Sequence, residues 1–163
     1  MSNSVYAAAA RCIFAVEPDE KCALTKKVSE QIQTQQLSYT ESTSAATIEV
    51  PGRPLKPVLV PPRMLAQRKL GSDSGRAAFI HAIAHIEFNA INLAWDAVYR
   101  FRGMPGQYYL DWAKVAREEA YHFSLLNQRL QEMGYAYGDF DAHDGLWEMA
   151  CKTDHDVLVR MAL

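Results

Sequence analysis

The chain has 163 residues, of which 49% are hydrophobic, so it can form one domain with a substantial core. This composition excludes a chain that is disordered throughout. A formal net charge of −2, without any run of like charge, indicates neither a nucleic-acid partner nor an anionic membrane surface. Cys12, Cys22 and Cys151 form no CxxC pair, and we expect them to be free, reduced thiols.

The N-terminal segment lacks the basic lead of a secretory signal peptide, and its apolar run is interrupted by Arg11 and followed by acidic residues. No stretch of the chain approaches the roughly 18 uncharged apolar residues of a membrane span. We therefore expect a cytoplasmic protein that does not enter a membrane.

The first part of the chain, residues 1–73, is expected to hold N-terminal helices and an extended strap. Residues 4–37 are typical of two helices, the first rich in alanine and the second, at 19–36, mostly polar with a thin apolar stripe. We expect both to be packing appendages. Five prolines between residues 51 and 62 predict an extended path, which either lies along another surface or is a free linker.

The second part, residues 74–163, is expected to form half of a helical bundle. Good N-cap residues at 71–74 precede a helical pattern from about 75 to 102, which is about 40 Å long at 1.5 Å per residue. A second helical pattern runs from 107 to 134. The short connector makes these helices antiparallel neighbours.

The end of the chain carries weaker signals. A loop rich in Gly, Tyr and Asp spans 134–145, and a brief apolar turn covers 146–151. Thr153 and Asp156 match a capping box, which predicts the start of a third bundle helix. The loop is not an EF-hand, because counting from Asp139 puts Asp144 and Ala150 where glycine and glutamate are required. A role for His143 near a site stays open.

The long helix at 75–102 presents two different faces. Its polar face carries His81, His85, Asn89, Asn92, Asp96 and Arg100. On the opposite face, one charged residue, Glu87, is surrounded by Ile83, Ala90, Ile91, Ala94 and Val98. The helix at 107–134 has Glu119 and His122 three residues apart within a stripe formed by Trp112, Val115, Ala116, Phe123, Leu126 and Leu130.

An ionised carboxylate in an apolar interior is costly without a partner, whereas a divalent cation makes the same arrangement favourable. Glu87, Glu119 and His122 therefore predict a metal site. Oxygen and imidazole ligands without thiolate suit iron or manganese and do not exclude zinc. One inward Glu beside a Glu-x-x-His motif is half of the di-iron or di-manganese ligand set of a ferritin-like four-helix bundle.

Other readings of the same residues stay open. Glu119 could pair with Arg117 or Arg129, while His122 could be a satisfied core histidine, because a bare Glu-x-x-His is common. His81 and His85 could chelate a metal, but their polar face favours a solvated or interface role.

Glu118 lies beside the apolar stripe of its helix, where a surface charge is expected rather than a ligand.

Four stretches resemble a family of uncharacterised bacterial ferritin-like proteins, a domain of unknown function: PGRPLKPVLVPPR, GRAAFIHAIAHIEFNAINLAWDA, DWAKVAREEAYHFSLLNQRL and YGDFDAHDGLWEMACKT. The resemblance implies an all-α ferritin-like bundle in which Glu87, Glu119 and His122 take the positions of the first-half metal ligands. It names no reaction, although the wider superfamily includes ferroxidases, rubrerythrin-like peroxidases and a di-iron hydroxylase acting on modified tRNA.

Members of the resembled family continue further and bring another inward Glu and a second Glu-x-x-His, which are missing here. We expect either a homodimer that pools two half-sites, giving four glutamates and two histidines, or a truncated chain with exposed apolar faces. The leading functional hypothesis is a di-iron or di-manganese oxidoreductase that activates dioxygen or peroxide on an unknown small-molecule substrate. The alternative is a non-enzymatic helical interaction module without metal, and nucleic-acid binding is not expected.

Overall fold

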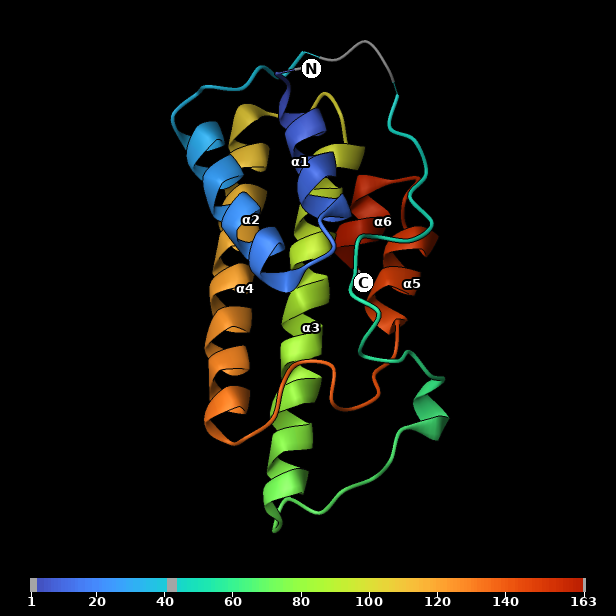
Figure 1. Ribbon diagram of the computed structural model, residues 1–163. Coiled ribbons are helices and arrows are strands. Elements are labelled where there is room, and N and C mark those ends of the chain that lie inside the picture. The colour runs from blue at the N-terminus through green and yellow to red at the C-terminus, as the bar shows by residue number, and fades with distance from the viewer. Residues whose placement is uncertain (1–2, 41–43, 163) are drawn as a thin grey trace.

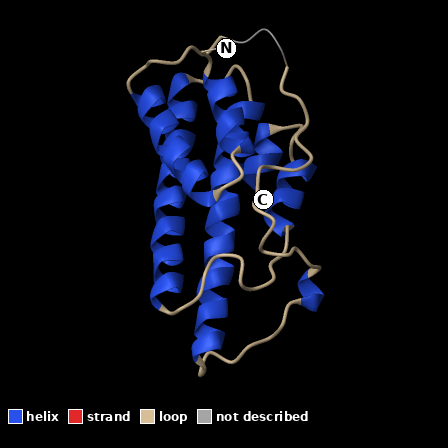
Figure 2. Cartoon of the chain, in the orientation of Figure 1, coloured by secondary structure: helices blue, strands red, loops and turns tan. Residues whose placement is uncertain are grey.

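The computed structural model describes residues 3–40 and 44–162, and this part of the chain is all-helical, with no strand (Figures 1 and 2). The predicted all-α class is confirmed. The helices are α1 (Val5–Phe14), α2 (Pro18–Gln33), the short 3-10 helix η1 (Pro62–Met64), α3 (Asp73–Arg100), α4 (Gly106–Glu132), α5 (Gly145–Lys152) and α6 (Val157–Ala162). None of these helices is long and apolar enough to cross a lipid bilayer.

Helices α3 and α4 form the antiparallel hairpin that the sequence predicts (Figure 1). At the start of α3, the Ser72 hydroxyl accepts a hydrogen bond from the Gly75 amide at 3.1 Å, as expected of an N-cap. Gly103 in the connector and Gly134 after α4 have φ values of 72° and 80°, a region that favours glycine. These glycines end the two helices within about a turn of the predicted positions.

The N-terminal helices cover one side of this hairpin, with α1 packed on α3 and α2 on α4 (Figure 1). The inward residues of α1 are fully buried: Val5, Ala8, Ala9, Cys12 and Ile13. They belong to one hydrophobic cluster with residues of α2, α3, α4 and α5. The expected appendages therefore contribute to the main core.

Lys21 on α2 is fully buried where α1, α2 and α3 meet. Its ammonium donates hydrogen bonds to the carbonyl oxygens of Cys12 and Ile13, both at 2.8 Å, and to Asn92 Oδ1 at 2.7 Å. It thus satisfies carbonyls in the last turn of α1 that have no partner within the helix. Burial lowers the pKa of Lys21 to about 7.

The proline-rich strap lies along the protein surface and is not a free linker. The Gly52 amide donates to the Ile13 carbonyl at 2.9 Å, and the Val60 amide donates to the Ala142 carbonyl at 2.8 Å. A Cβ at Gly52 would meet the Phe14 carbonyl oxygen at 2.3 Å, so this close approach requires glycine. Leu55 nevertheless remains 99% exposed.

The polar face of α3 is buried, so the predicted solvated or interface role for its histidines is wrong. His81 Nε2 accepts a hydrogen bond from the Gly138 amide at 2.9 Å. The His85 ring lies between the Tyr137 hydroxyl, 2.8 Å from Nδ1, and the His143 carbonyl oxygen, 3.0 Å from Nε2. The loop after α4 therefore folds back over α3 and supplies partners for both rings.

Burial also sets the charge of these two rings. It lowers the pKa of His81 to about 4 and lowers the pKa of His85 below its usual value. Both side chains are therefore neutral near pH 7. They act as buried polar contacts between α3 and the loop.

Asp96, further along the same face of α3, is also buried. Arg100 Nη2 lies 2.8 Å from Asp96 Oδ1, and Arg160 Nη1 of α6 lies 2.9 Å from Asp96 Oδ2. This ion-pair network holds α6 against α3.

The predicted start of the last helix at Thr153 is wrong. The Thr153 hydroxyl donates to the Met149 carbonyl at 2.9 Å, at the end of α5. The Asp156 carboxylate instead accepts from the amides of Leu158, at 2.7 Å, and Val159, at 3.1 Å, and so caps α6.

Candidate metal centre

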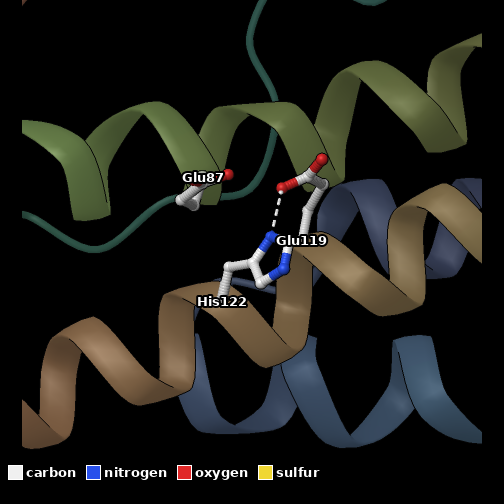
Figure 3. Close-up of side chains that lie close together, drawn as sticks. All are labelled: Glu87, Glu119 and His122. Carbon is white, nitrogen blue, oxygen red and sulfur yellow. Dashed lines mark hydrogen bonds and ion pairs between the residues drawn. The ribbon is translucent and has the colours of Figure 1, made fainter.

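The three residues singled out as ligands come together between α3 and α4 (Figure 3). Glu87 lies near the middle of α3. Glu119 and His122 lie on α4, where a spacing of three residues places both on the same side of the helix. The antiparallel pairing of the two long helices therefore creates the cluster.

The ligand atoms are close enough to share an ion after a small adjustment. His122 Nδ1 lies 3.1 Å from Glu119 Oε2, and one ligand atom from each of the three residues lies within 4.8 Å of the others. Two ligands that bind an ion at about 2.2 Å can be at most about 4.4 Å apart. Small side-chain rotations would close this gap.

The Glu119 carboxyl affects the proton occupancy of Glu87. A hydrogen bond with Glu119, together with burial and the negative charge of Glu119, raises the pKa of Glu87 to about 7, while nearby His122 opposes the rise. Two carboxylates at this separation favour holding a proton between them. A cation would replace that proton and satisfy both groups.

The cationic partners that could have neutralised Glu119 lie elsewhere. Arg129 pairs with Glu132 at 2.9 Å. In residues 3–40 and 44–162, the close polar contact of Glu119 is with His122, and neither Arg117 nor Arg129 lies within 4.0 Å of its carboxylate. Pairing of Glu119 with arginine is therefore not the explanation for this cluster.

The expectation that the cluster lies in an apolar interior is wrong. Glu87 is partly exposed, and the side chains of Glu119 and His122 are 23% and 50% exposed. Helices α1 and α2 cover the other side of the hairpin, where the ring of Phe88 lies 5.5 Å from that of Phe123. The metal-ligand candidates consequently line an open face.

The structure also places the other charged and histidine candidates. Glu118 is exposed and lies 3.8 Å from Lys114, as expected of a surface charge. His143 Nδ1 accepts a hydrogen bond from the Gly145 amide at 3.1 Å, within its own loop. His81 and His85 have the protein partners described above. Within the described part of the chain, only the cluster of Glu87, Glu119 and His122 brings three potential ligands together.

Comparison with known proteins places the chain in a family. Residues 14–163 match the family described as "Protein of unknown function (DUF455)". The chain belongs to this family. It is 46% identical over 157 residues to a protein of Haemophilus influenzae named "Uncharacterized protein", a match that covers 90% of this chain and 54% of the relative.

This DUF455 chain therefore spans about half the length of the Haemophilus relative. No solved structure matches it. The predicted membership of an uncharacterised family is confirmed.

Proposed function

We propose that this DUF455 protein binds a divalent metal ion, iron or manganese, through Glu87, Glu119 and His122, as half of a ferritin-like carboxylate centre. The observation that carries the proposal is the convergence of these three side chains from two helices, with ligand atoms within 4.8 Å of one another. The raised pKa of Glu87 supports it, because two carboxyl groups held together without a neutralising lysine or arginine favour a cation.

The donor set suits this chemistry. Carboxylate oxygen and imidazole nitrogen bind iron and manganese, and three protein ligands leave coordination positions open. A redox-active metal at such a site supplies reactions with dioxygen or peroxide, and we propose an oxidoreductase role on this basis.

A second copy of the chain would complete the centre. We propose a two-fold homodimer in which the open faces meet and each copy contributes the same three ligands. Large apolar side chains on α3 and α4 remain about half exposed, namely Phe79 at 54%, Ile86 at 49% and Leu125 at 46%. Their burial in a dimer would favour association.

The test is metal content after anaerobic purification with ferrous iron. We expect about one iron per chain in a dimer, and Glu119→Ala should remove it. Glu118→Ala is the matched control, because Glu118 neighbours the site in sequence but is an exposed charge beside Lys114. Iron-free protein at saturating metal, or equal loss in both variants, would contradict the proposal.

The exposed apolar side chains of α3 and α4 also favour a second candidate, a helical interaction module without metal. Such a protein would be a monomer or part of a complex with a different protein, and it would contain no metal. Light scattering combined with metal analysis distinguishes the two, because the metal proposal requires iron and dimer together.

A further inference from the structure

A groove between α2 and α4 is lined by none of the three metal-ligand candidates. It contains a hollow of about 560 Å³. These two helices lie side by side in Figure 1. The hollow reaches α4 through residues such as Arg117, Ala120 and Ser124, which lie on a different side of the helix from Glu119.

The floor of the hollow is apolar because small residues meet there. Cys22 and Ala23 come from α2 and Ala120 comes from α4, so neither helix fills the space between them. The Cys22 thiol lies 3.7 Å from the Ala120 carbonyl oxygen, to which it donates, and burial raises the pKa of Cys22. The thiol is therefore a neutral part of the lining and not a reactive group.

Two cations border this apolar floor. Lys26 and Arg117 line the hollow, and within residues 3–40 and 44–162 neither side chain has an ion pair or hydrogen bond. Glu118 also lines it, but its carboxylate lies 3.8 Å from Lys114. The edge of the hollow is therefore positive.

A second hollow of about 380 Å³ adjoins the first, and Arg117 lines both. The lining of this second hollow is more polar than that of the first. It includes Gln33 from α2 and Gln107, Asp111 and Lys114 from α4. The groove thus becomes more polar beyond the Arg117 guanidinium, which has no ion pair or hydrogen bond within the described residues. Ligand sites in proteins combine an apolar hollow of this size with a few polar groups.

We propose that the α2–α4 groove binds an amphipathic carboxylate of the fatty-acid type. Its apolar chain occupies the hollow over Cys22, Ala23 and Ala120, and its carboxylate lies at Arg117 and Lys26, facing the second, more polar hollow. A guanidinium accepts a carboxylate in a bidentate arrangement, which fixes the position of the anionic end.

The test uses decanoate, titrated into the full ¹⁵N-labelled chain and followed by NMR. EDTA is present, so the probe cannot bind through a metal at Glu119. We expect saturable shifts confined to residues 22–26 and 117–124. Decan-1-ol, which has the same chain without the charge, should bind at least about threefold more weakly, the size of effect expected of exposed charge pairs.

Variants separate the cationic edge from the apolar floor. Lys26→Gln and Arg117→Gln should each weaken decanoate binding about threefold or more. Lys27→Gln is the matched control, because Lys27 is also exposed on α2 but does not line the hollow. Ala23→Phe should block binding by filling the hollow from a solvent-exposed position.

Three outcomes would overturn the proposal. They are shifts located on the open face around Glu87 in place of the α2–α4 groove, equal binding of decanoate and decan-1-ol, and no difference between Arg117→Gln and Lys27→Gln.

Discussion

Replacement of Glu87 by glutamine should stabilise the metal-free protein at alkaline pH. In the folded chain the pKa of Glu87 is raised from its ordinary value of 4.5 to about 7 by the Glu119 carboxyl. Between these values the folded state binds more protons than the unfolded state, so stability falls as pH rises through about 7. The loss of stability caused by ionising Glu87 is absent below pH 4.5 and complete above pH 7.

The size of this penalty follows from the difference between the two pKa values. A gap of this size corresponds to about 3 kcal/mol. Because Glu87 is partly exposed, solvent screening reduces the expected value to about 1 kcal/mol. In EDTA at pH 8, the free energy of unfolding of Glu87→Gln should therefore be about 1 kcal/mol higher than that of the wild type. At pH 4 the two proteins should be equally stable.

The assay is urea denaturation followed by circular dichroism, with EDTA and then with manganese. At a manganese concentration 100 times the Kd, the wild type should gain about 2.7 kcal/mol of stability, and Glu87→Gln should lose most of this gain. Glu118→Gln should behave as the wild type in both conditions. A Glu87→Gln variant that is less stable than the wild type at pH 8 without metal would refute the reasoning, as would one that keeps the full manganese effect.

Three further predictions concern the buried polar groups. Asp96→Asn should lower the free energy of unfolding by about 3–5 kcal/mol and expose α6 to proteolysis, because Arg160 would lose its buried partner. Between pH 7 and pH 9, the free energy of unfolding of the wild type should rise by up to about 2 kcal/mol relative to that of Lys21→Met. Over this range Lys21 loses its proton in the folded state, where its pKa is about 7, but keeps it in the unfolded state. Tyr137→Phe should cost about 1–2 kcal/mol by leaving His85 Nδ1 without its donor.

Each of these predictions has a contradicting outcome in the same denaturation assay. If Asp96→Asn lowers the free energy of unfolding by less than about 1 kcal/mol, the range of a surface ion pair, the first prediction is wrong. For Lys21, parallel pH profiles of wild type and Lys21→Met would mean that the buried amine does not change its protonation. An unchanged midpoint for Tyr137→Phe would mean that its hydroxyl does not hold the loop to α3.

The long helices could be predicted from the sequence because their signals are local. Ser72 and Gly103 mark the ends of α3 through hydrogen bonding and backbone conformation, and both act within a few residues. The convergence of Glu87, Glu119 and His122 followed from the same information, because a short connector makes the helices antiparallel and sets which turns meet.

The burial of the polar face of α3 could not be predicted in the same way. His81 and His85 look solvent-facing on a helical projection, and their partners, the Gly138 amide and the Tyr137 hydroxyl, lie more than 50 residues away. Only the return of the loop over α3 makes them a satisfied buried network. A face rich in His and Asn, with no Lys or Glu, was the available signal, because such residues are buried more readily than Lys or Glu.

The exposure of the metal-ligand candidates could not be predicted from the sequence either. The apolar stripe around Glu119 predicted an enclosed site, but an amphipathic pattern does not state which segment covers it. In the described structure α2 covers the other side of α4, and His122 is left half exposed.

The central claim is that Glu87, Glu119 and His122 together hold a divalent metal. Its most direct test is a crystal grown with manganese, with diffraction data collected at the manganese absorption edge. We predict an anomalous peak within about 2.2 Å of a carboxylate oxygen of each glutamate and of an imidazole nitrogen of His122. A peak elsewhere on the chain, or no peak between α3 and α4 at saturating manganese, would contradict it.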